Sequence, residues 1–157
     1  RLYSPIAQLG VRRLMLTGAY KVEKAYFETH VLTAETWRPL LLEGLAQCKD
    51  TRVPLVTVHR SPTWLVRDEL PSLVPEPALR LVADPAATLG VRAAIEARQS
   101  ELGRIVLAVG PEGGWAPREE RLFDAHGFVR VGLGARTLRS DVAVVALLTL
   151  VHDALGP

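Results

Sequence analysis

The sequence is poor in cysteine and histidine, and this scarcity restricts the sites that it can build. Cys48 is the one cysteine among 157 residues, so an internal disulfide framework is excluded. The four histidines are not spaced like metal ligands, and we expect no metal site. Because a chain without disulfides suits a reducing compartment, we expect a cytoplasmic protein.

Long hydrophobic runs are also lacking. The longest apolar stretch, residues 142–151, contains Thr149 and is too short to cross a bilayer. No charged-then-apolar signal sequence opens the chain, so we expect a soluble protein without a membrane partner. Residues 1–10 have apolar side chains at helical spacing but no helix-start signal. We therefore expect that upstream residues are missing.

Lysine is scarce, with three lysines against sixteen arginines. The formal net charge is +2, and the isoelectric point is about 9.0. Guanidinium groups suit phosphates and stacked bases better than ammonium groups do, which favours a nucleic-acid partner weakly. Ordinary solvated surfaces of an arginine-rich protein would explain the composition equally well.

The chain does contain an alternation of strand and helix patterns that is typical of a single α/β domain. Short apolar runs predict strands at 11–16, 53–58, 79–83, 104–109 and 128–133. Helical patterns lie at 1–9, 36–48, 63–70, 86–98, 117–126 and 141–155, with Pro71 expected to end the third and Gly90 to weaken the fourth. This order predicts one mostly parallel sheet with helices on both faces.

The most informative segment is a strand that runs into a glycine-rich loop. The apolar residues 104–109 are followed by the loop Gly110-Pro111-Glu112-Gly113-Gly114, and Pro117 then starts a helix. Ligands of open α/β sheets bind at the carboxyl ends of strands, which makes this loop a candidate site. It matches neither common phosphate-binding motif. A tight turn would explain the glycine pair structurally, but Glu112 beside open backbone favours contact with a ligand.

A second loop, residues 132–140, joins the strand at 128–133 to the last helix. Ser140 or Asp141 can cap that helix. Arg139 lies directly before the helix start and next to an acid, a position that suits a polar or anionic substrate. The helix itself is apolar on nearly all sides, so we expect it to be buried in the core or against a second subunit.

Together the segments VLAVGPEGGWAPREE and VGLGARTLRSDVAVVALLTL resemble the RsmE-type 16S rRNA (uracil-N3)-methyltransferases of the SPOUT class. The similarity is specific from about residue 81 to 155 and thinner upstream. It implies an α/β fold with a C-terminal trefoil knot, which hydrophobic periodicity cannot reveal. Residues 1–157 would form the SPOUT methyltransferase domain, without the N-terminal PUA-like RNA-binding domain of the family. S-adenosylmethionine as cofactor, ribosomal RNA of the small subunit as partner and a homodimer are implied as well.

The resemblance also implies the site residues. Cofactor contacts are expected from Ala83, Val109, Gly110, Glu112, Gly113, Gly114, Leu133, Gly134, Leu138 and Arg139. Because N3 of neutral uracil carries a proton, the reaction needs a base or an oxyanion stabiliser. We expect Arg139 to stabilise negative charge on the pyrimidine oxygens, and Asp141 or Glu112 to accept or orient the proton.

The sequence departs from the family pattern at several positions. Ser140-Asp141 replaces a usual Thr-Glu, Ala116 a capping serine, Ala46 and Asp50 a Glu and an Arg, and Gln8 a Glu. We expect a weaker helix cap at Ala116 and altered substrate contacts at Gln8, Ala46 and Asp50.

Two alternatives stay open at this point: a SPOUT methyltransferase for another rRNA or tRNA site, and a non-catalytic RNA-binding or assembly module of the same fold. An unrelated α/β nucleotide-binding domain is disfavoured, because neither phosphate-binding motif is present.

Overall fold

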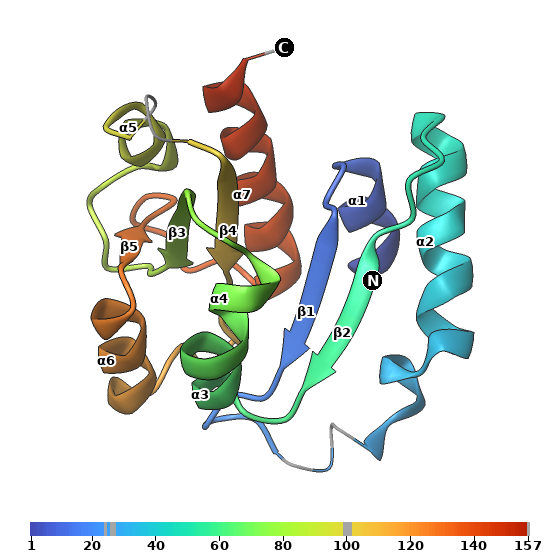
Figure 1. Cartoon of the computed structure of the whole chain (residues 1–157), viewed down its shortest axis with the longest axis horizontal. Helices are drawn as coiled ribbons and strands as arrows, with labels where there is room; N and C mark the ends of the chain where they lie inside the picture. The colour runs from blue at the N-terminus through green and yellow to red at the C-terminus, as the bar shows by residue number, and fades with distance from the viewer. Residues whose placement is uncertain (24, 26–27, 99–101, 157) are drawn as a thin grey trace. The chain divides into compact units, whose positions relative to one another are not determined.

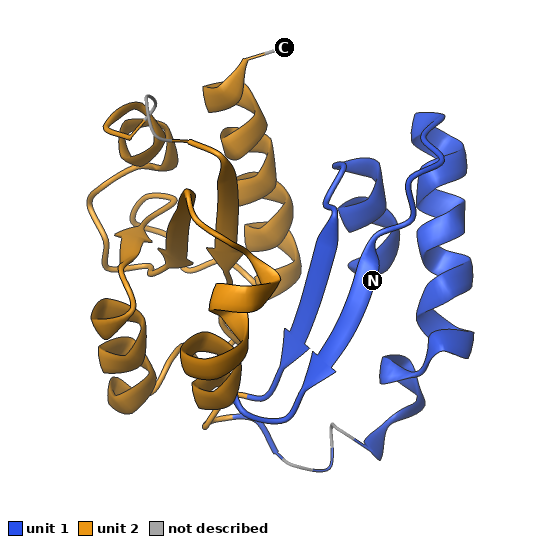
Figure 2. Ribbon diagram, in the orientation of Figure 1, with its two compact units in different colours: residues 1–18, 22–61 blue, residues 19–21, 62–157 orange. Residues whose placement is uncertain are grey.

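The computed structural model describes residues 1–23, 25, 28–98 and 102–156 and has an α/β fold, as predicted (Figure 1). The chain divides into two compact units, which Figure 2 shows in different colours. Unit 1 contains residues 1–18 and 22–61, and unit 2 contains residues 19–21 and 62–157. Within the described residues, no helix is long and apolar enough to cross a membrane.

Unit 1 is a parallel strand pair with helices. Its elements are α1 (Tyr3–Gln8), β1 (Arg13–Thr17), the 3₁₀ turn η2 (His30–Leu32), α2 (Ala34–Cys48) and β2 (Leu55–His59). Helix α2 packs against α1, where Gly44 faces the backbone of Ser4 so closely that a Cβ would collide with the Ser4 carbonyl. Buried Ala7, Leu41 and Leu45 form the core of this unit.

Unit 2 contains a parallel sheet in the order β4-β3-β5, built from β3 (Ala78–Ala83), β4 (Arg104–Ala108) and β5 (Phe128–Val131). All of the predicted strands are therefore present, and every pairing is parallel. The prediction of one sheet was wrong, because the described strands form a two-stranded and a three-stranded sheet. A strand's apolar pattern indicates that it is buried, but it does not encode which strand becomes its neighbour.

The helices of unit 2 are α3 (Pro62–Trp64), the π-helix η3 (Leu65–Glu69), α4 (Leu70–Leu73), α5 (Val91–Glu96), α6 (Pro117–Ala125) and α7 (Ser140–Leu155). Pro71 does not end the third predicted helix, which continues to Leu73 through the π-helical turn. A π turn shifts the backbone bonds, so the missing N–H of proline is tolerated there. The helix predicted at 86–98 begins only at Val91, because Gly90 is extended (φ −82°, ψ 158°) and serves as its N-cap.

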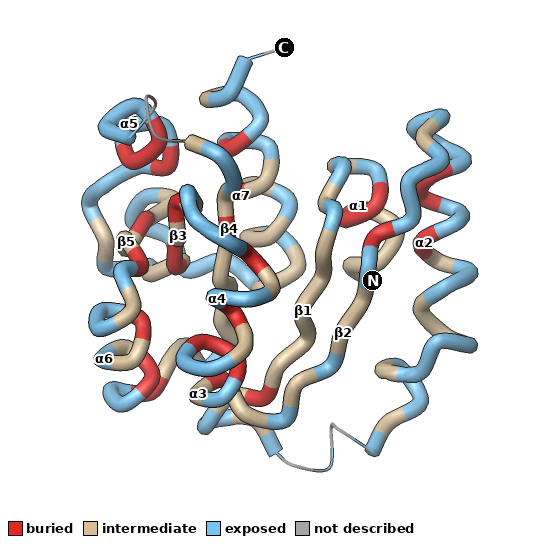
Figure 3. The backbone as a smooth tube through the Cα atoms, viewed as in Figure 1, coloured by how far each residue is buried: buried red, intermediate tan, exposed pale blue. Residues whose placement is uncertain are grey.

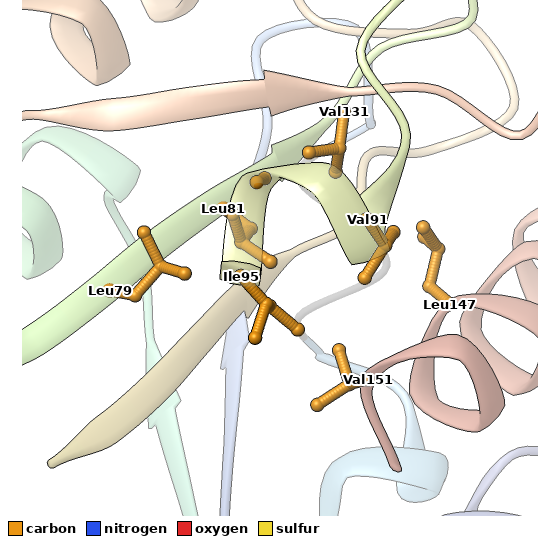
Figure 4. Packing of buried hydrophobic residues seen from close by; sticks show 8 residues of the cluster. Leu79, Leu81, Val91, Ile95, Val131, Leu147 and Val151 are labelled. Atoms are coloured by element: carbon orange, nitrogen blue, oxygen red, sulfur yellow. The ribbon is translucent and has the colours of Figure 1, made fainter. Parts of the chain in front are cut away.

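The core of unit 2 lies between its sheet and the helices α5 and α7. Figure 4 shows the apolar side chains that meet there, contributed by Leu79, Leu81, Val91, Ile95, Val131, Leu147 and Val151. Helix α7 buries only Leu147 and Val151, whereas its residues Val142, Val145, Leu150 and Leu155 are exposed. Figure 3 shows that much of α7 is exposed or half-buried. The core of unit 2 therefore covers the side of α7 that carries Leu147 and Val151, and the opposite side, with Val142 and Val145, stays open.

Candidate functional site

A pocket in unit 2 lies where β3 and β4 end and α7 begins, the edge of a parallel sheet where ligands are expected. It is lined by Val82, Ala83, Asp84, Pro85, Val109, Gly110, Pro111, Glu112, Gly114, Trp115, Glu120, Phe123, Arg130, Thr137, Leu138, Ser140 and Ala143. The two loops that the sequence singled out therefore contribute to one pocket.

A side-chain bond joins these two loops. The Ser140 hydroxyl donates a hydrogen bond of 2.8 Å to the carbonyl oxygen of Gly110, thirty residues earlier. The glycine at 110 leaves room for the Trp115 indole, because a Cβ there would lie 3.0 Å from the ring, closer than side chains usually pack. Gly114 has φ +67° and closes a turn by donating its N–H to the Pro111 carbonyl at 2.8 Å. The loop backbone is thus held in one conformation beside the pocket.

The structure brings the three predicted catalytic residues together. Arg139 lies between two carboxylates, with 3.7 Å from its Nε to Oε1 of Glu112 and 3.2 Å from its Nη2 to Oδ2 of Asp141. The side chains are 59% exposed for Arg139, 72% for Glu112 and 29% for Asp141. Because exposed ion pairs contribute little free energy, the guanidinium can exchange these partners for a ligand at small cost.

The predicted cofactor residues divide into two groups. Ala83, Val109, Gly110, Glu112, Gly114 and Leu138 line the pocket, whereas Gly113, Leu133, Gly134 and Arg139 do not. Leu133 packs against the core cluster instead. Gly134 has φ +96°, so a left-handed backbone explains the glycine there. Among the predicted catalytic residues, Glu112 lines the pocket and Arg139 and Asp141 lie beside it through their ion pairs.

Sequence reasoning missed a charged network on the pocket wall. Arg130 of β5 hydrogen-bonds Asp84 at 3.0 Å and Asp124 at 2.8 Å, and its Nη1 lies 3.7 Å from Glu120. The hydrogen bonds to Asp124 and then to Asp84 raise the pKa of Arg130, and the bond from Arg130 lowers the pKa of Asp124. An acid directly after β3 was the signal in the sequence that could have identified Asp84.

A buried carboxylate was also missed. Glu119 is only 2% exposed, and it accepts hydrogen bonds of 2.8 Å from the backbone N–H groups of Ala116 and Tyr20. Ala116 has no capping side chain, as expected, but Glu119 supplies the reciprocal half of a capping box. Glu119 therefore joins the start of α6 to a segment 99 residues earlier in the chain.

Comparisons with known proteins agree with this geometry. A family model described as RNA methyltransferase domain matches residues 2–152. A protein of Treponema pallidum named ribosomal RNA small subunit methyltransferase E is 30% identical over 151 residues, which cover 96% of this chain and 56% of that protein. A protein of the same name from Aquifex aeolicus is 28% identical over 119 residues, covering 76% of this chain and 47% of that protein. The chain spans about half the length of these relatives.

Solved structures share the fold. A putative methyltransferase from Legionella pneumophila, in complex with the bound cofactor SAM, superposes with a TM-score of 0.78 at 23% identity, over 98% of this chain and 60% of that one. A ribosomal RNA small subunit methyltransferase E from Neisseria gonorrhoeae, bound to S-adenosyl methionine, gives a TM-score of 0.76 at 22% identity, over 95% and 57% of the two chains.

Proposed function

This chain belongs to the family of RNA methyltransferase domains, and we propose that it transfers a methyl group from S-adenosylmethionine to N3 of a uridine in 16S ribosomal RNA. The names of the relatives support ribosomal RNA of the small subunit as the substrate. One observation carries the proposal: Glu112, Arg139 and Asp141 form a charged network beside a pocket at the carboxyl ends of two parallel strands.

The pocket residues suit the proposed cofactor. S-adenosylmethionine supplies a methyl group on a sulfonium cation and also carries an adenine ring and an ammonium group. Apolar walls from Val109, Leu138 and Ala143 suit the ring, and the backbone around Gly110 can approach a ligand closely. Carboxylates of Asp84 and Glu120 on the wall complement the positive charge of the cofactor.

The charged network can perform the remaining chemistry. A proton leaves uracil N3 for a carboxylate of Asp141 or Glu112, and the N3 lone pair forms the new bond to the methyl carbon as the carbon–sulfur bond breaks. Negative charge spreads onto the two pyrimidine oxygens, where Arg139 stabilises it by turning from its present acidic partners. The target base has to leave any helix that it occupies to reach this network.

The homodimer that the resemblance implies is part of the proposal. Its support is the open apolar side of α7, where Val142 is 52% exposed. We expect a dimer by light scattering and a monomer for Val142→Glu. The same change at Val31, an exposed valine of unit 1, is the control and is expected to leave the dimer intact. A parent protein that is monomeric at all concentrations would contradict the proposed homodimer.

The trefoil knot and the cytoplasmic location that the family resemblance implies are also part of the proposal. The backbone after β5 runs against the loop after β3, since the Gly132 N–H donates to the Leu89 carbonyl at 2.9 Å and the Asp84 N–H to the Val131 carbonyl at 3.0 Å. A Cβ at Gly132 would collide with the Ala87 carbonyl. This close passage of the two loops is the observation that supports the proposed knot.

The experiment that tests the reaction combines calorimetry and methyl transfer. S-adenosylmethionine is titrated into the protein, and a tritiated methyl group is then followed into small ribosomal subunits, large subunits and transfer RNA. We expect binding and label in the small subunit. If the protein binds S-adenosylmethionine but the label appears only in another RNA, that RNA is the substrate. If it binds S-adenosylmethionine but methylates no RNA, the chain is the non-catalytic module.

A further inference from the structure

We propose that Tyr20 and Arg118 form a contact for an unpaired stretch of RNA beside the glycine-rich loop, with Tyr20 stacking on a base and Arg118 binding the backbone. The inference rests on the proposed function in one respect, that the RNA bound here is the substrate. Neither residue lines the pocket, so this contact is additional to the cofactor site.

Tyr20 presents an exposed aromatic ring. Its side chain is among the most exposed large apolar groups of the chain, at 65%. The backbone beneath it is nevertheless fixed, because the Tyr20 N–H donates to the buried Glu119 carboxylate at 2.8 Å. A rigid support with an open aromatic ring is the arrangement that a stacking contact needs.

The neighbouring residue ties the same segment to the glycine-rich loop. The Lys21 ammonium donates a hydrogen bond of 2.7 Å to the carbonyl oxygen of Gly113. Gly113 directly follows Glu112, which pairs with Arg139. Tyr20 is therefore held next to the loop that carries one member of the proposed catalytic network. A nucleotide stacked on Tyr20 would be a near neighbour of the base being modified.

Arg118 completes the contact. Its guanidinium carbon lies 4.6 Å from the centre of the Tyr20 ring, within the range of a cation–π interaction. Among the described residues, Arg118 has no carboxylate partner, whereas Arg67, Arg130 and Arg139 are each paired with an acid. Its charge is therefore available to a phosphate. The planar guanidinium and the phenol ring together offer a stacking surface and a positive charge at one place.

This chemistry selects single-stranded RNA. A base can stack on an aromatic side chain only when its face is free, whereas a duplex hides its bases and is recognised by shape and backbone. Aromatic and cationic groups placed side by side are the usual means of holding unpaired strands. The structure thus favours a loop or an opened strand over a helix as the partner of this surface.

The test uses the full chain, a short fluorescein-labelled single-stranded RNA of mixed sequence and the duplex of the same length. For Tyr20→Ala we expect the dissociation constant of the single strand to rise by about 5-fold to 100-fold, the range measured for loss of one base stack. Tyr20→Phe keeps the ring and should bind within about twofold of the parent. Arg118→Ala should reduce the slope of log affinity against log salt by about 0.7, the value for one phosphate of a single strand.

Two matched controls lie elsewhere in unit 2. Trp64 is 61% exposed, similar to Tyr20, and Arg67 is an exposed arginine paired with Asp68. Trp64→Ala and Arg67→Ala should leave the affinity for the single strand unchanged. Equal affinity of Tyr20→Ala and the parent would overturn the inference, as would a parent that binds no single-stranded RNA or prefers the duplex.

Calorimetry with S-adenosylmethionine separates this inference from the proposed function. Tyr20→Ala should bind the cofactor as the parent does, because Tyr20 does not line the pocket. If the parent transfers methyl groups and Tyr20→Ala has the same KM for RNA as the parent, the proposed contact is refuted and the proposed function is unaffected. If RNA binding depends on Tyr20 but the parent does not bind S-adenosylmethionine, the proposed function is refuted and the contact is unaffected.

Discussion

The two units use the same kinds of element but place their polar bonds differently. In unit 1 the Asp50 carboxylate acts locally, accepting hydrogen bonds from the backbone N–H groups of Thr51 and Arg52 and from the Arg52 guanidinium. The Tyr3 hydroxyl does donate to the Val31 carbonyl, 28 residues away, but neither residue belongs to the candidate site. In unit 2, Ser140 reaches Gly110 and Glu119 reaches Tyr20, across 30 and 99 residues. Local bonds fix a turn, whereas long-range bonds hold several loops around one pocket. The candidate site lies where Ser140 and Glu119 join distant segments of unit 2.

The comparison is tested most strongly at Arg139 of unit 2. Arg139→Ala removes the group that we expect to stabilise the pyrimidine oxygens, and loss of one such donor lowers turnover by about 100-fold to 1000-fold. Methyl transfer to ribosomal RNA is measured under saturating cofactor, with calorimetry to show that S-adenosylmethionine still binds. Arg67→Ala is the control, since Arg67 is also an exposed arginine bonded to a neighbouring acid. An unchanged turnover of Arg139→Ala would contradict the proposed stabilisation of the pyrimidine oxygens by Arg139.

One glycine in each unit allows the effects on stability and on cofactor binding to be separated. Gly44→Ala in unit 1 forces α2 away from the Ser4 backbone and should lower the free energy of unfolding by about 1–3 kcal/mol. The affinity of the folded protein for S-adenosylmethionine should not change. Gly110→Ala in unit 2 displaces the Trp115 ring and should weaken cofactor binding by about tenfold.

Urea unfolding and calorimetry measure these two effects separately. Gly90→Ala is the control for both, because a Cβ there meets no atom within 4 Å and the backbone φ is negative. A cofactor affinity that falls for Gly44→Ala as much as for Gly110→Ala would mean that the binding function is not confined to unit 2.

The buried carboxylate of unit 2 should affect stability by an amount similar to that of Gly44. Glu119→Gln keeps one acceptor oxygen and leaves the second backbone N–H without its partner, which costs about 1–3 kcal/mol when the group is buried. Thermal unfolding checks this value, and Glu120→Gln, on the more exposed neighbouring residue, is the control. We expect little change for Glu120→Gln. Equal melting temperatures for the two variants would show that Glu119 does not hold the segment at Tyr20.

The smallest effect is expected at Asp50 of unit 1. Its hydrogen bonds to the Arg52 side chain and backbone lower the pKa of Asp50 from 3.8 to about 2. Because the pKa is lower in the folded state, the carboxylate stabilises the protein above about pH 4, and this contribution is lost as the pH falls toward 2. The melting temperatures of Asp50→Asn and the parent should therefore differ slightly at neutral pH and converge in acid. A constant difference would contradict this assignment.

The sequence was sufficient to predict features that depend on local patterns. Apolar runs identified all of the described strands, and the glycine loop and the loop before α7 were recognised as parts of one site before the structure placed them together. The family resemblance, rather than any local pattern, singled out Glu112, Arg139 and Asp141 as candidate catalytic residues, and the structure pairs Arg139 with both carboxylates.

Features that depend on distant contacts could not be predicted. The bond from Tyr20 to Glu119 joins segments with no shared pattern, and the division of the strands into two sheets depends on pairing. Pro71 was misjudged because a π-helical turn, which composition does not indicate, accommodates it. The bond between Asp50 and Arg52 in the turn after α2 was not predicted either, and the expectation of altered substrate contacts at Asp50 stays a prediction.

Nucleoside mass spectrometry of 16S ribosomal RNA, from cells with and without the gene for this chain, is the decisive experiment for the proposed reaction. The proposed function predicts 3-methyluridine in the RNA of cells that have the gene, its loss when the gene is removed, and its return with the parent gene but not with Arg139→Ala. An unchanged amount of 3-methyluridine after removal of the gene would contradict the claim.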